Sequence, residues 1–307
     1  MDCKLNNEEL QLEWLMFDFD NTLVDFHKAS ELAFDQCFRD YDLKQKSDYY
    51  KVYGKINTKV WKDFEDKKIT ALDIREIRFT KFLEQINVTH LDGLAFNTQY
   101  LNNLVMFTTI RPEVKNMLSA MKKKYKLSII TNGLKEVQRP RLEHCGITSF
   151  FDSIIVSDEI GVAKPHKEFF DVAMASIDEH IDKRKILVIG DSLNSDIAGA
   201  RAYGLKSCFV NKNKESSLDA DIIISDVLEL SAVIEDVYLP VNCDWYDYLE
   251  IYSMKKVDLE IQFHSEGKLE IFRGKIHDLK TKNKEEFALL SDGNKIRLDR
   301  IINIQVL

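Results

Sequence analysis

The sequence predicts an α/β protein with a doubly wound parallel sheet, an α-helical insertion after the first strand and a small all-β domain at the C-terminal end. Three observations support this prediction. Short apolar runs alternate with helix-like segments between residues 112 and 236. Residues 26–106 contain no proline and carry aromatic side chains at helical spacing. From residue 241 onward, apolar and polar residues alternate with the period of two that antiparallel strands show.

The first apolar run, residues 14–17, predicts a buried strand that ends at Asp18. Further strands are expected at residues 127–130, 154–156, 186–189, 207–210 and 222–224. Helices are expected between them, at residues 113–123, 135–144, 167–177 and 196–203. Because strands and helices alternate, the sheet should be parallel, and its ligands should bind beyond the carboxyl ends of the strands.

The C-terminal segment should fold separately. Residues 257–263, 269–271 and 296–298 alternate in polarity, and Gly267 and residues 292–294 predict turns between strands. Strands packed into about 65 residues favour a small closed or half-closed barrel. We therefore expect a core formed by residues 1–25 and 107–240, a helical insertion at residues 26–106 and a barrel at residues 241–307.

Composition limits the classes of function. The chain has 307 residues and a net charge of −8, which argues against direct nucleic-acid binding but allows a small phosphorylated ligand in a local cationic site. No apolar run approaches the ~20 residues of a membrane span, and residues 1–13 lack the pattern of a signal peptide. The five scattered cysteines favour neither structural zinc nor a disulfide framework. These features together predict a cytoplasmic protein.

Two carboxylates follow the first strand, Asp18 and Asp20. Carboxylates this close repel each other unless a cation or a proton intervenes, and Mg²⁺ prefers carboxylate and phosphate oxygens. Asp18 could then attack phosphorus, while Asp20 could act as a general acid and base. The alternative is an acidic strand end that faces solvent.

Thr131, Asn132 and Gly133 follow the second strand of the predicted sheet. The hydroxyl of Thr131 and backbone N–H groups freed by the glycine turn could hold a phosphate. Lys164, next to Pro165, could stabilise the phosphate charge. An ordinary turn and a solvated loop lysine are the alternatives.

Gly190 and Asp191 end a further strand, and Asp196 stands where the next helix is expected. Asp191 could bind a metal. Asp196 could hold Lys164 or a metal-bound water, or it could simply cap the helix. The order of these groups, with the first, second and fourth at the ends of predicted strands, favours phosphoryl transfer through an aspartyl-phosphate with one Mg²⁺.

These motifs resemble those of the haloacid dehalogenase-like hydrolase superfamily over residues 12–236. The resemblance implies a Rossmann-like core, with the helical insertion as a cap that closes over the site. It implies Asp18 as nucleophile, Asp20 as general acid and base, and Thr131 and Lys164 as stabilisers of the phosphoryl group. Because Asp20 is present, it implies a phosphatase rather than a dehalogenase.

The same resemblance implies the metal site. Mg²⁺ would be bound by Asp18, the backbone carbonyl of Asp20 and Asp191, with Asp196 as the accessory carboxylate of the fourth motif.

A closer similarity concerns the pyrimidine 5′-nucleotidase branch. It rests on Asn57, Trp61 and residues 69–79, 129–133, 141–143 and 156–165. The similarity implies a pyrimidine nucleoside 5′-monophosphate as substrate, and Asn57, Trp61 and Arg78 as cap residues that face it. Packing for Trp61 and a surface salt bridge for Arg78 are the alternatives. A phosphatase for sugar phosphates or other metabolites is the alternative function.

The C-terminal segment resembles the Rho-binding antiterminator family, through residues 242–244, 246–247, 249–250, 274, 278–279 and 297–301. The resemblance implies a short helix, an Sm-like barrel and binding to transcription terminator Rho by residues 241–307. Eleven Lys and Arg residues face twelve Asp and Glu residues from Asn242 to Leu307, a balance that gives little support to RNA binding. A dimerising or regulatory barrel, or a regulatory protein in which the hydrolase is secondary, is the alternative.

Overall fold

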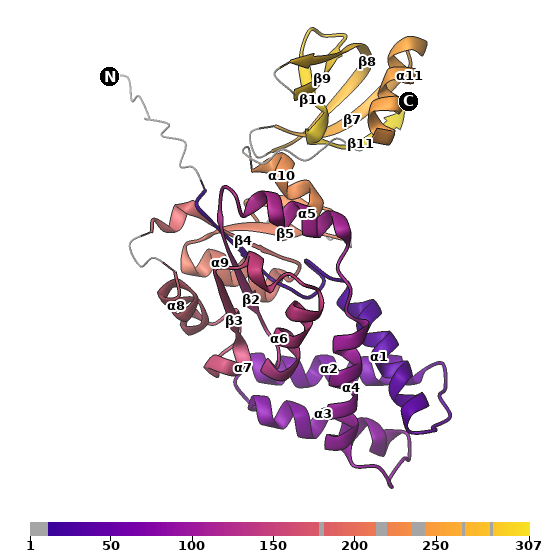
Figure 1. Ribbon diagram of the computed structural model, residues 1–307, viewed down its shortest axis with the longest axis vertical. Helices are drawn as coiled ribbons and strands as arrows, with labels where there is room; N and C mark the ends of the chain where they lie inside the picture. The colour runs from indigo at the N-terminus through magenta and orange to yellow at the C-terminus, as the bar shows by residue number, and fades with distance from the viewer. Residues whose placement is uncertain (1–11, 178–180, 213–219, 235–242, 266–267, 283–284) are drawn as a thin grey trace.

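A six-stranded parallel sheet forms the centre of the computed structural model (Figure 1). The structure describes residues 12–177, 181–212, 220–234, 243–265, 268–282 and 285–307. The expected turn at Gly267 and the domain junction at residues 240 and 241 lie outside these ranges. The strands are β1 (Trp14–Phe17), β2 (Lys126–Thr131), β3 (Ser153–Val156), β4 (Ile186–Gly190), β5 (Lys206–Val210) and β6 (Ile222–Ile224).

Strand β1 is buried on both faces, as a central strand of a doubly wound sheet should be. Leu15 and Phe17 join one core with α5 (Pro112–Met121). Trp14 and Met16 join the core on the other face with α8 (Lys167–Ala175) and α9 (Ala198–Tyr203). The predicted doubly wound α/β core is confirmed.

The strand order β3-β2-β1-β4-β5-β6 reverses direction beside β1. The chain moves outward from β1 to β2 and β3, and then returns to β4 on the other side of β1. Phe17 pairs with Ile129 of β2 and with Ile189 of β4, so these three strands end together. Such a reversal is where doubly wound sheets bind their ligands, because side chains after adjacent strands meet there. Helix α6 (Lys135–His144) follows β2 over the predicted residues.

Four helices between β1 and α5 form the inserted unit: α1 (Phe26–Asp40), α2 (Tyr49–Glu65), α3 (Ala71–Gln85) and α4 (Gly93–Phe107). They pack together at one end of the molecule (Figure 1). Their core is aromatic, with the rings of Tyr53 and Phe79 stacked 4.7 Å apart. A capping box of Thr70 and Asp73 begins α3. The aromatic spacing in the sequence is therefore confirmed as the buried face of four helices.

The C-terminal segment forms a separate antiparallel sheet, at the opposite end of the molecule from α1–α4 (Figure 1). Helix α11 (Cys243–Lys255) precedes β7 (Asp258–Ser265), β8 (Lys268–Lys282), β9 (Glu285–Leu290), β10 (Lys295–Arg297) and β11 (Ile301–Val306). Long strand β8 pairs with both β7 and β9, and its register shifts between Ile276 and Asp278. A register shift of this kind bends a sheet, which confirms the predicted small barrel.

The predicted helix at residues 196–203 differs at its start. A π-helical turn, η3 (Leu193–Ile197), precedes α9, and the Ser192 hydroxyl accepts a hydrogen bond from the backbone N–H of Ser195. The short elements α7 (Ser157–Ile160) and α10 (Leu230–Val233) were not predicted. A single helical turn carries too few residues to show a helical period.

Within the described ranges, no helix combines the length and the apolar character that crossing a membrane requires.

Candidate active site

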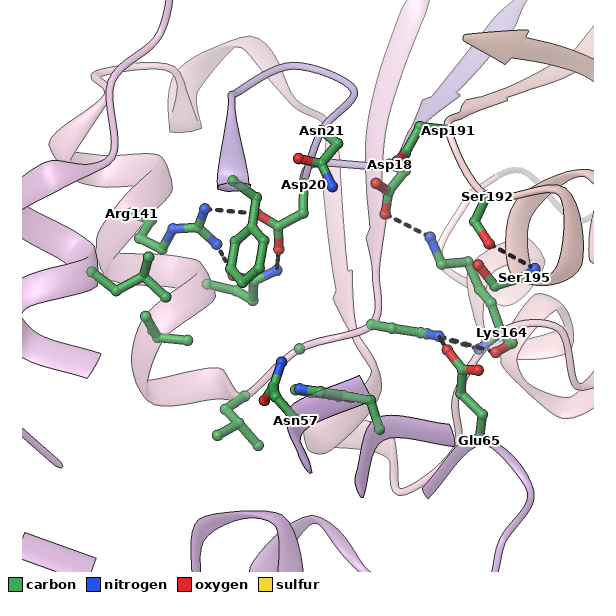
Figure 2. A pocket seen from close by; sticks show the side chains of 18 of the residues that line it. Asp18, Asp20, Asn21, Asn57, Glu65, Arg141, Lys164, Asp191, Ser192 and Ser195 are labelled. Atoms are coloured by element: carbon green, nitrogen blue, oxygen red, sulfur yellow. Dashed lines mark hydrogen bonds and ion pairs between the residues drawn. The ribbon is translucent and has the colours of Figure 1, made fainter. Parts of the chain in front are cut away.

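A cavity of about 270 Å³ lies between the edge of the central sheet and helices α2–α4 (Figure 2). This volume is close to the lower end, about 300 Å³, of the usual range for small-molecule sites. Every residue that the sequence singled out for the site, except Thr131, lines it. These residues are Asp18, Asp20, Asn57, Trp61, Arg78, Asn132, Gly133, Lys164, Asp191 and Asp196. Segments far apart in the chain therefore meet at one cavity.

Lys164 is the centre of the charged network on the core side of the cavity. It is 1% exposed, and its Nζ donates to Asp18 Oδ1 at 2.7 Å, to Asp196 Oδ1 at 2.6 Å and to the carbonyl of Ile130 at 2.7 Å. Burial lowers the pKa of Lys164, but the two carboxylates outweigh burial and leave it above its usual value. The ammonium group is thus charged and fully hydrogen-bonded.

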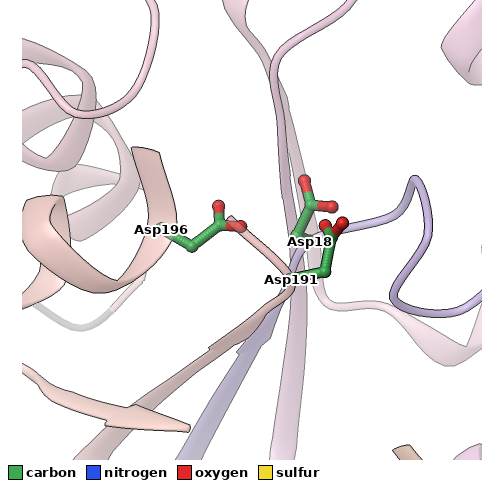
Figure 3. A group of neighbouring side chains, drawn as sticks. All are labelled: Asp18, Asp191 and Asp196. Atoms are coloured by element: carbon green, nitrogen blue, oxygen red, sulfur yellow. The ribbon is translucent and has the colours of Figure 1, made fainter. Parts of the chain in front are cut away.

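Three carboxylates surround this single ammonium group. Asp18, Asp191 and Asp196 each offer an oxygen, and these oxygens lie within 4.8 Å of one another (Figure 3). Burial raises the pKa of Asp18 well above its usual value, and Lys164 opposes this rise only in part. Burial, with the charge of Asp196, raises the pKa of Asp191 to about 7. The excess of negative charge and the hard oxygen donors fit a divalent cation such as Mg²⁺.

Asp196 is less available to a metal than the other two carboxylates. Its Oδ1 is bound by Lys164, and its Oδ2 accepts the backbone N–H of Ser192 at 3.1 Å. A Cβ atom at Gly190 would overlap this carboxylate, so the glycine at the end of β4 is needed for Asp196 to lie there. Asp196 therefore binds Lys164, which is one of the roles that the sequence allowed, and Asp18 and Asp191 are the carboxylates more available to a metal.

Asp20 lies on the cavity wall with different partners from Asp18. Its Oδ1 accepts from Arg141 Nη2 at 2.6 Å, and its Oδ2 accepts from Gln138 Nε2 at 3.0 Å (Figure 2). The chain turns directly after Asp20, where Asn21 has a left-handed backbone with φ of 56°. Asparagine tolerates this conformation better than most residues. The turn places the two carboxylates of the Asp-x-Asp motif in separate networks.

Gln138 and Arg141 were not predicted as site residues. Gln138 Nε2 also donates to Thr131 Oγ1 at 2.7 Å, and Arg141 donates to Thr108 Oγ1 at 2.7 Å and to Gln138 Oε1 at 2.6 Å. Thr131 is fully buried beneath the cavity wall. Residues three apart on a helix share a face, and this spacing in α6 was the available signal. The direction of that face could not be known without the position of α6.

Asn132 and Gly133 hold the loops in place. Asn132 Oδ1 accepts the backbone N–H of Lys164 at 2.8 Å, and its Nδ2 donates to the Lys164 carbonyl at 3.0 Å. The N–H of Gly133, which we expected to be free for phosphate, donates instead to Ser157 Oγ at 3.0 Å. A Cβ atom at Gly133 would collide with Gln138, so this glycine makes room for the amide that binds Asp20.

The helices contribute the opposite wall of the cavity. Glu65, the last residue of α2, was not predicted; its Oε1 accepts from Asn132 Nδ2 at 3.2 Å, and burial raises its pKa. Its carbonyl accepts from His166 Nε2 at 2.6 Å. Trp61 lines the cavity and also packs edge-on against Phe64, with 5.8 Å between the rings. The inserted helices and the sheet edge are thus hydrogen-bonded to each other at the site.

Comparison with known proteins places this geometry in context. Residues 12–204 match the family model for haloacid dehalogenase-like hydrolases. The pyrimidine 5′-nucleotidase YjjG of Escherichia coli is 32% identical over 66% of this chain and 87% of its own length. The pyrimidine 5′-nucleotidase PynA of Streptococcus pneumoniae is 28% identical over 65% of this chain and 84% of its own length.

A solved structure and a second family model complete the comparison. The crystal structure of the HAD-hydrolase YfnB from Bacillus subtilis, bound to magnesium, superimposes with a TM-score of 0.68. It is 29% identical and covers 73% of this chain and 99% of its own length. Residues 240–307 match the family described as modulator of Rho-dependent transcription termination.

Proposed function

We propose that this chain removes phosphate from pyrimidine nucleoside 5′-monophosphates. The chain belongs to the haloacid dehalogenase-like hydrolase family and is a phosphomonoesterase. One observation carries the proposal. The buried ammonium group of Lys164 binds Asp18 and Asp196 at once, beside Asp191, on the wall of a cavity that suits a small ligand. A cluster of buried charges like this one lowers the stability of the fold unless a ligand neutralises it, and such clusters are typical of functional sites.

The proposed division of the chain follows the positions of the elements. Residues 1–25 and 107–240 form the catalytic core, residues 26–106 form the cap and residues 241–307 form the barrel. The cavity lined by both core and cap residues supports the cap as the unit that shields the reaction from water and selects the substrate.

In the proposed reaction, a carboxylate oxygen of Asp18 attacks the substrate phosphorus, and the bond from phosphorus to the leaving oxygen breaks. Asp20 gives its proton to that oxygen, and later takes a proton from the water that hydrolyses the aspartyl-phosphate. Lys164 stabilises the charge on the phosphoryl oxygens. Thr131, buried beneath the wall, accepts a hydrogen bond from Gln138 and so helps to position that amide. Arg141 and Gln138 hold the carboxyl group of Asp20 at the cavity wall.

The carboxylates of Asp18 and Asp191 support Mg²⁺ as the cofactor. We propose the backbone carbonyl of Asp20 as its third ligand, as the resemblance implies. When bound there, the ion would offset the charge of the carboxylates and of the phosphoryl oxygens. Its presence would also let Asp18 and Asp191 be ionised together at neutral pH, which burial opposes in the chain alone.

Phosphate release from a panel of nucleoside monophosphates and sugar phosphates tests this function. We expect the highest kcat/KM for pyrimidine nucleotides, loss of activity with a chelator and recovery with Mg²⁺. Asp18→Asn should reduce kcat by about 10⁴-fold or more, as removal of a catalytic nucleophile does. Turnover that survives Asp18→Asn would contradict the mechanism, and a preference for sugar phosphates would contradict the substrate.

A second function is favoured by the match of residues 240–307 and by the separate barrel there. We propose that this barrel binds transcription terminator Rho. The full chain, immobilised, should retain Rho at micromolar concentration, and a chain that ends at residue 234 should not. Equal retention by the two chains, or by neither, would remove this function.

A further inference from the structure

Arg78 of α3 is a buried arginine whose hydrogen bonds are incomplete. It is 3% exposed and lies on the cavity wall. Its Nε donates to Asn97 Oδ1 at 2.7 Å, and its Nη1 makes only a long contact, 3.4 Å, with Asn57 Oδ1. Its Nη2 is buried and has no hydrogen-bond partner among the residues that the structure describes. The guanidinium group therefore has donor capacity that the described part of the chain does not use.

The charge of Arg78 is also unbalanced. No carboxylate of the described residues forms an ion pair with it. Its guanidinium carbon lies 5.5 Å from the ring centre of Phe79 and 5.3 Å from that of Tyr100, inside the aromatic core of the cap. Aromatic faces attract a cation, but they replace a carboxylate only in part. A buried cation in this state suits a ligand that brings an electron-rich oxygen.

Asn57 adds a second donor at the same place. Its Oδ1 is the acceptor for both Arg78 Nη1 and the hydroxyl of Tyr53, each at 3.4 Å. The amide nitrogen of Asn57 is thus the group left for a ligand, and Asn57 also lines the cavity. Two donors without an acceptor beside them predict that the ligand presents acceptor oxygens here.

Apart from Glu65, which binds Asn132 at the end of α2, the other cap residues of this wall are apolar. Trp61, Leu101 and Leu104 line the cavity from the cap, and Phe26 lines it from the first turn of α1. Flat aromatic and aliphatic surfaces with a few polar groups are typical of sites that bind a planar ring. The carboxylates and Lys164 lie on the core side of the same cavity, so a phosphorylated ligand would direct its other end to this wall.

We propose that Arg78, together with Asn57, determines substrate specificity by binding an acceptor oxygen at the end of the substrate remote from the phosphate. The apolar wall favours a carbonyl oxygen of a planar nucleobase, and a carboxylate oxygen of a phosphorylated sugar acid offers the same chemistry. This proposal rests on the proposed nucleotidase function and names Arg78 as the residue that recognises the nucleobase.

Kinetics with two matched substrates test this role. Uridine 5′-monophosphate carries the ring carbonyls, whereas ribose 5-phosphate carries the same sugar and phosphate without a base. Arg78→Met should lower kcat/KM for uridine 5′-monophosphate by about 10- to 100-fold, as loss of a hydrogen bond from a charged group does. It should leave ribose 5-phosphate within about twofold. Arg78→Lys, which keeps the charge, should recover part of the loss.

A control variant separates this effect from a general change of charge or structure. Lys59→Met removes a cation from the outer surface of the cap, where the Lys59 side chain is 74% exposed, and should change neither rate. An equal loss on both substrates in Arg78→Met would show a structural role and overturn the proposal. A loss that appears only with a phosphorylated sugar acid would support the oxygen-binding role and assign it to a carboxylate.

Equilibrium binding keeps the proposal testable if the enzyme does not hydrolyse nucleotides. Calorimetry would compare uridine 5′-monophosphate binding to the full-length Asp18→Asn chain with and without Arg78→Met, in Mg²⁺. A Kd raised tenfold or more by Arg78→Met would support the proposal even without turnover. Unchanged affinity, or no binding of either the nucleotide or the sugar acid phosphate, would overturn it.

Discussion

Two buried arginines face the same cavity from opposite sides, and their surroundings differ. Arg141, on the core side, is fully buried and donates to Asp20, Gln138 and Thr108. Arg78, on the cap side, has Nη2 without a partner and no carboxylate beside it among the described residues. Both rest against aromatic rings, so the contrast lies in polar partners alone.

Arg141 on the core wall has its hydrogen bonds made within the protein, whereas Arg78 on the cap wall has a donor that no described residue accepts. An unpaired buried donor costs about 1–3 kcal/mol, a cost that a fully bonded group avoids. On the core side the donors of Arg141 and Lys164 have acceptors, and these hydrogen bonds hold Asp20 and Lys164 in place before substrate binds. On the cap side the missing acceptor is the one that a substrate would bring. Under the proposed function, the core wall would carry the chemistry and the cap wall would bind the part of the substrate remote from the phosphate.

Lys164→Met should have the largest effect on stability and on kcat. The change leaves Asp18 and Asp196 buried without their cation, so we expect the free energy of unfolding to fall by about 3–5 kcal/mol. Phosphatase kcat should fall by about 10³-fold or more, because the phosphoryl charge loses its stabilising group. Urea unfolding and initial rates measure the two effects. Lys167→Met, at an exposed lysine that pairs with Asp171, is the control and should change little.

The stabilities of Arg141→Met and Arg78→Met test the contrast between the two arginines. Arg141→Met strands the carboxylate of Asp20 and should cost about 3 kcal/mol of stability, with a drop in kcat of about 10²-fold. Arg78→Met removes a buried cation that pairs with no carboxylate among the described residues, but it also leaves Asn97 Oδ1 without its donor, so it should cost about 1 kcal/mol or less. Thermal or urea unfolding of both variants without substrate gives the result. Equal destabilisation by the two changes would contradict the division between the walls.

Arg75→Ala should have the smallest effect. Arg75 of α3 ties the cap to the core through Glu136 and Asp158, each at 2.5 Å. We expect a rise in KM of a few fold, since cap closure loses a contact, and a loss of stability of about 1 kcal/mol at pH 7.

The pH dependence of the Arg75→Ala effect has a defined sign. Burial raises the pKa of Asp158, but hydrogen bonds from Arg75 and the backbone N–H of Lys135 outweigh it, and the folded pKa is lowered. A lowered carboxyl pKa contributes stability that is present above its unfolded value, about 3.9, and is lost as pH falls through the folded value. Wild type and Arg75→Ala should therefore converge in stability below about pH 4. A difference that grows toward low pH would contradict this ion pair.

The parts of the fold that follow from local pattern were predicted. The strands and most helices of the core could be predicted because apolar runs and polar strand ends are local features, and α6 has the expected bounds. The same logic brought Asp18 and Asp191 to one edge, since parallel strands end together. Lys164 comes from the loop after α7, and its place beside them depends on how that loop packs.

The partners of these residues could not be predicted, because they depend on how elements pack. Gln138 and Arg141 reach Asp20 because of the direction in which α6 packs, and no local sequence pattern indicates that direction. The position of β3 beside β2 brings Ser157 to the N–H of Gly133, which the sequence left free for phosphate. The missing partner of Arg78 is likewise visible only once the helices of the cap are packed.

In the proposed mechanism, Asp18 forms a covalent bond to phosphorus. Rapid acid quench of the enzyme with Mg²⁺ and a ³²P-labelled pyrimidine nucleotide, followed by peptide mapping, would detect this bond. We predict label on the peptide that contains Asp18, rising before free phosphate appears, and no label in Asp18→Asn. Release of phosphate without any labelled protein, or label on another residue, would contradict the claim.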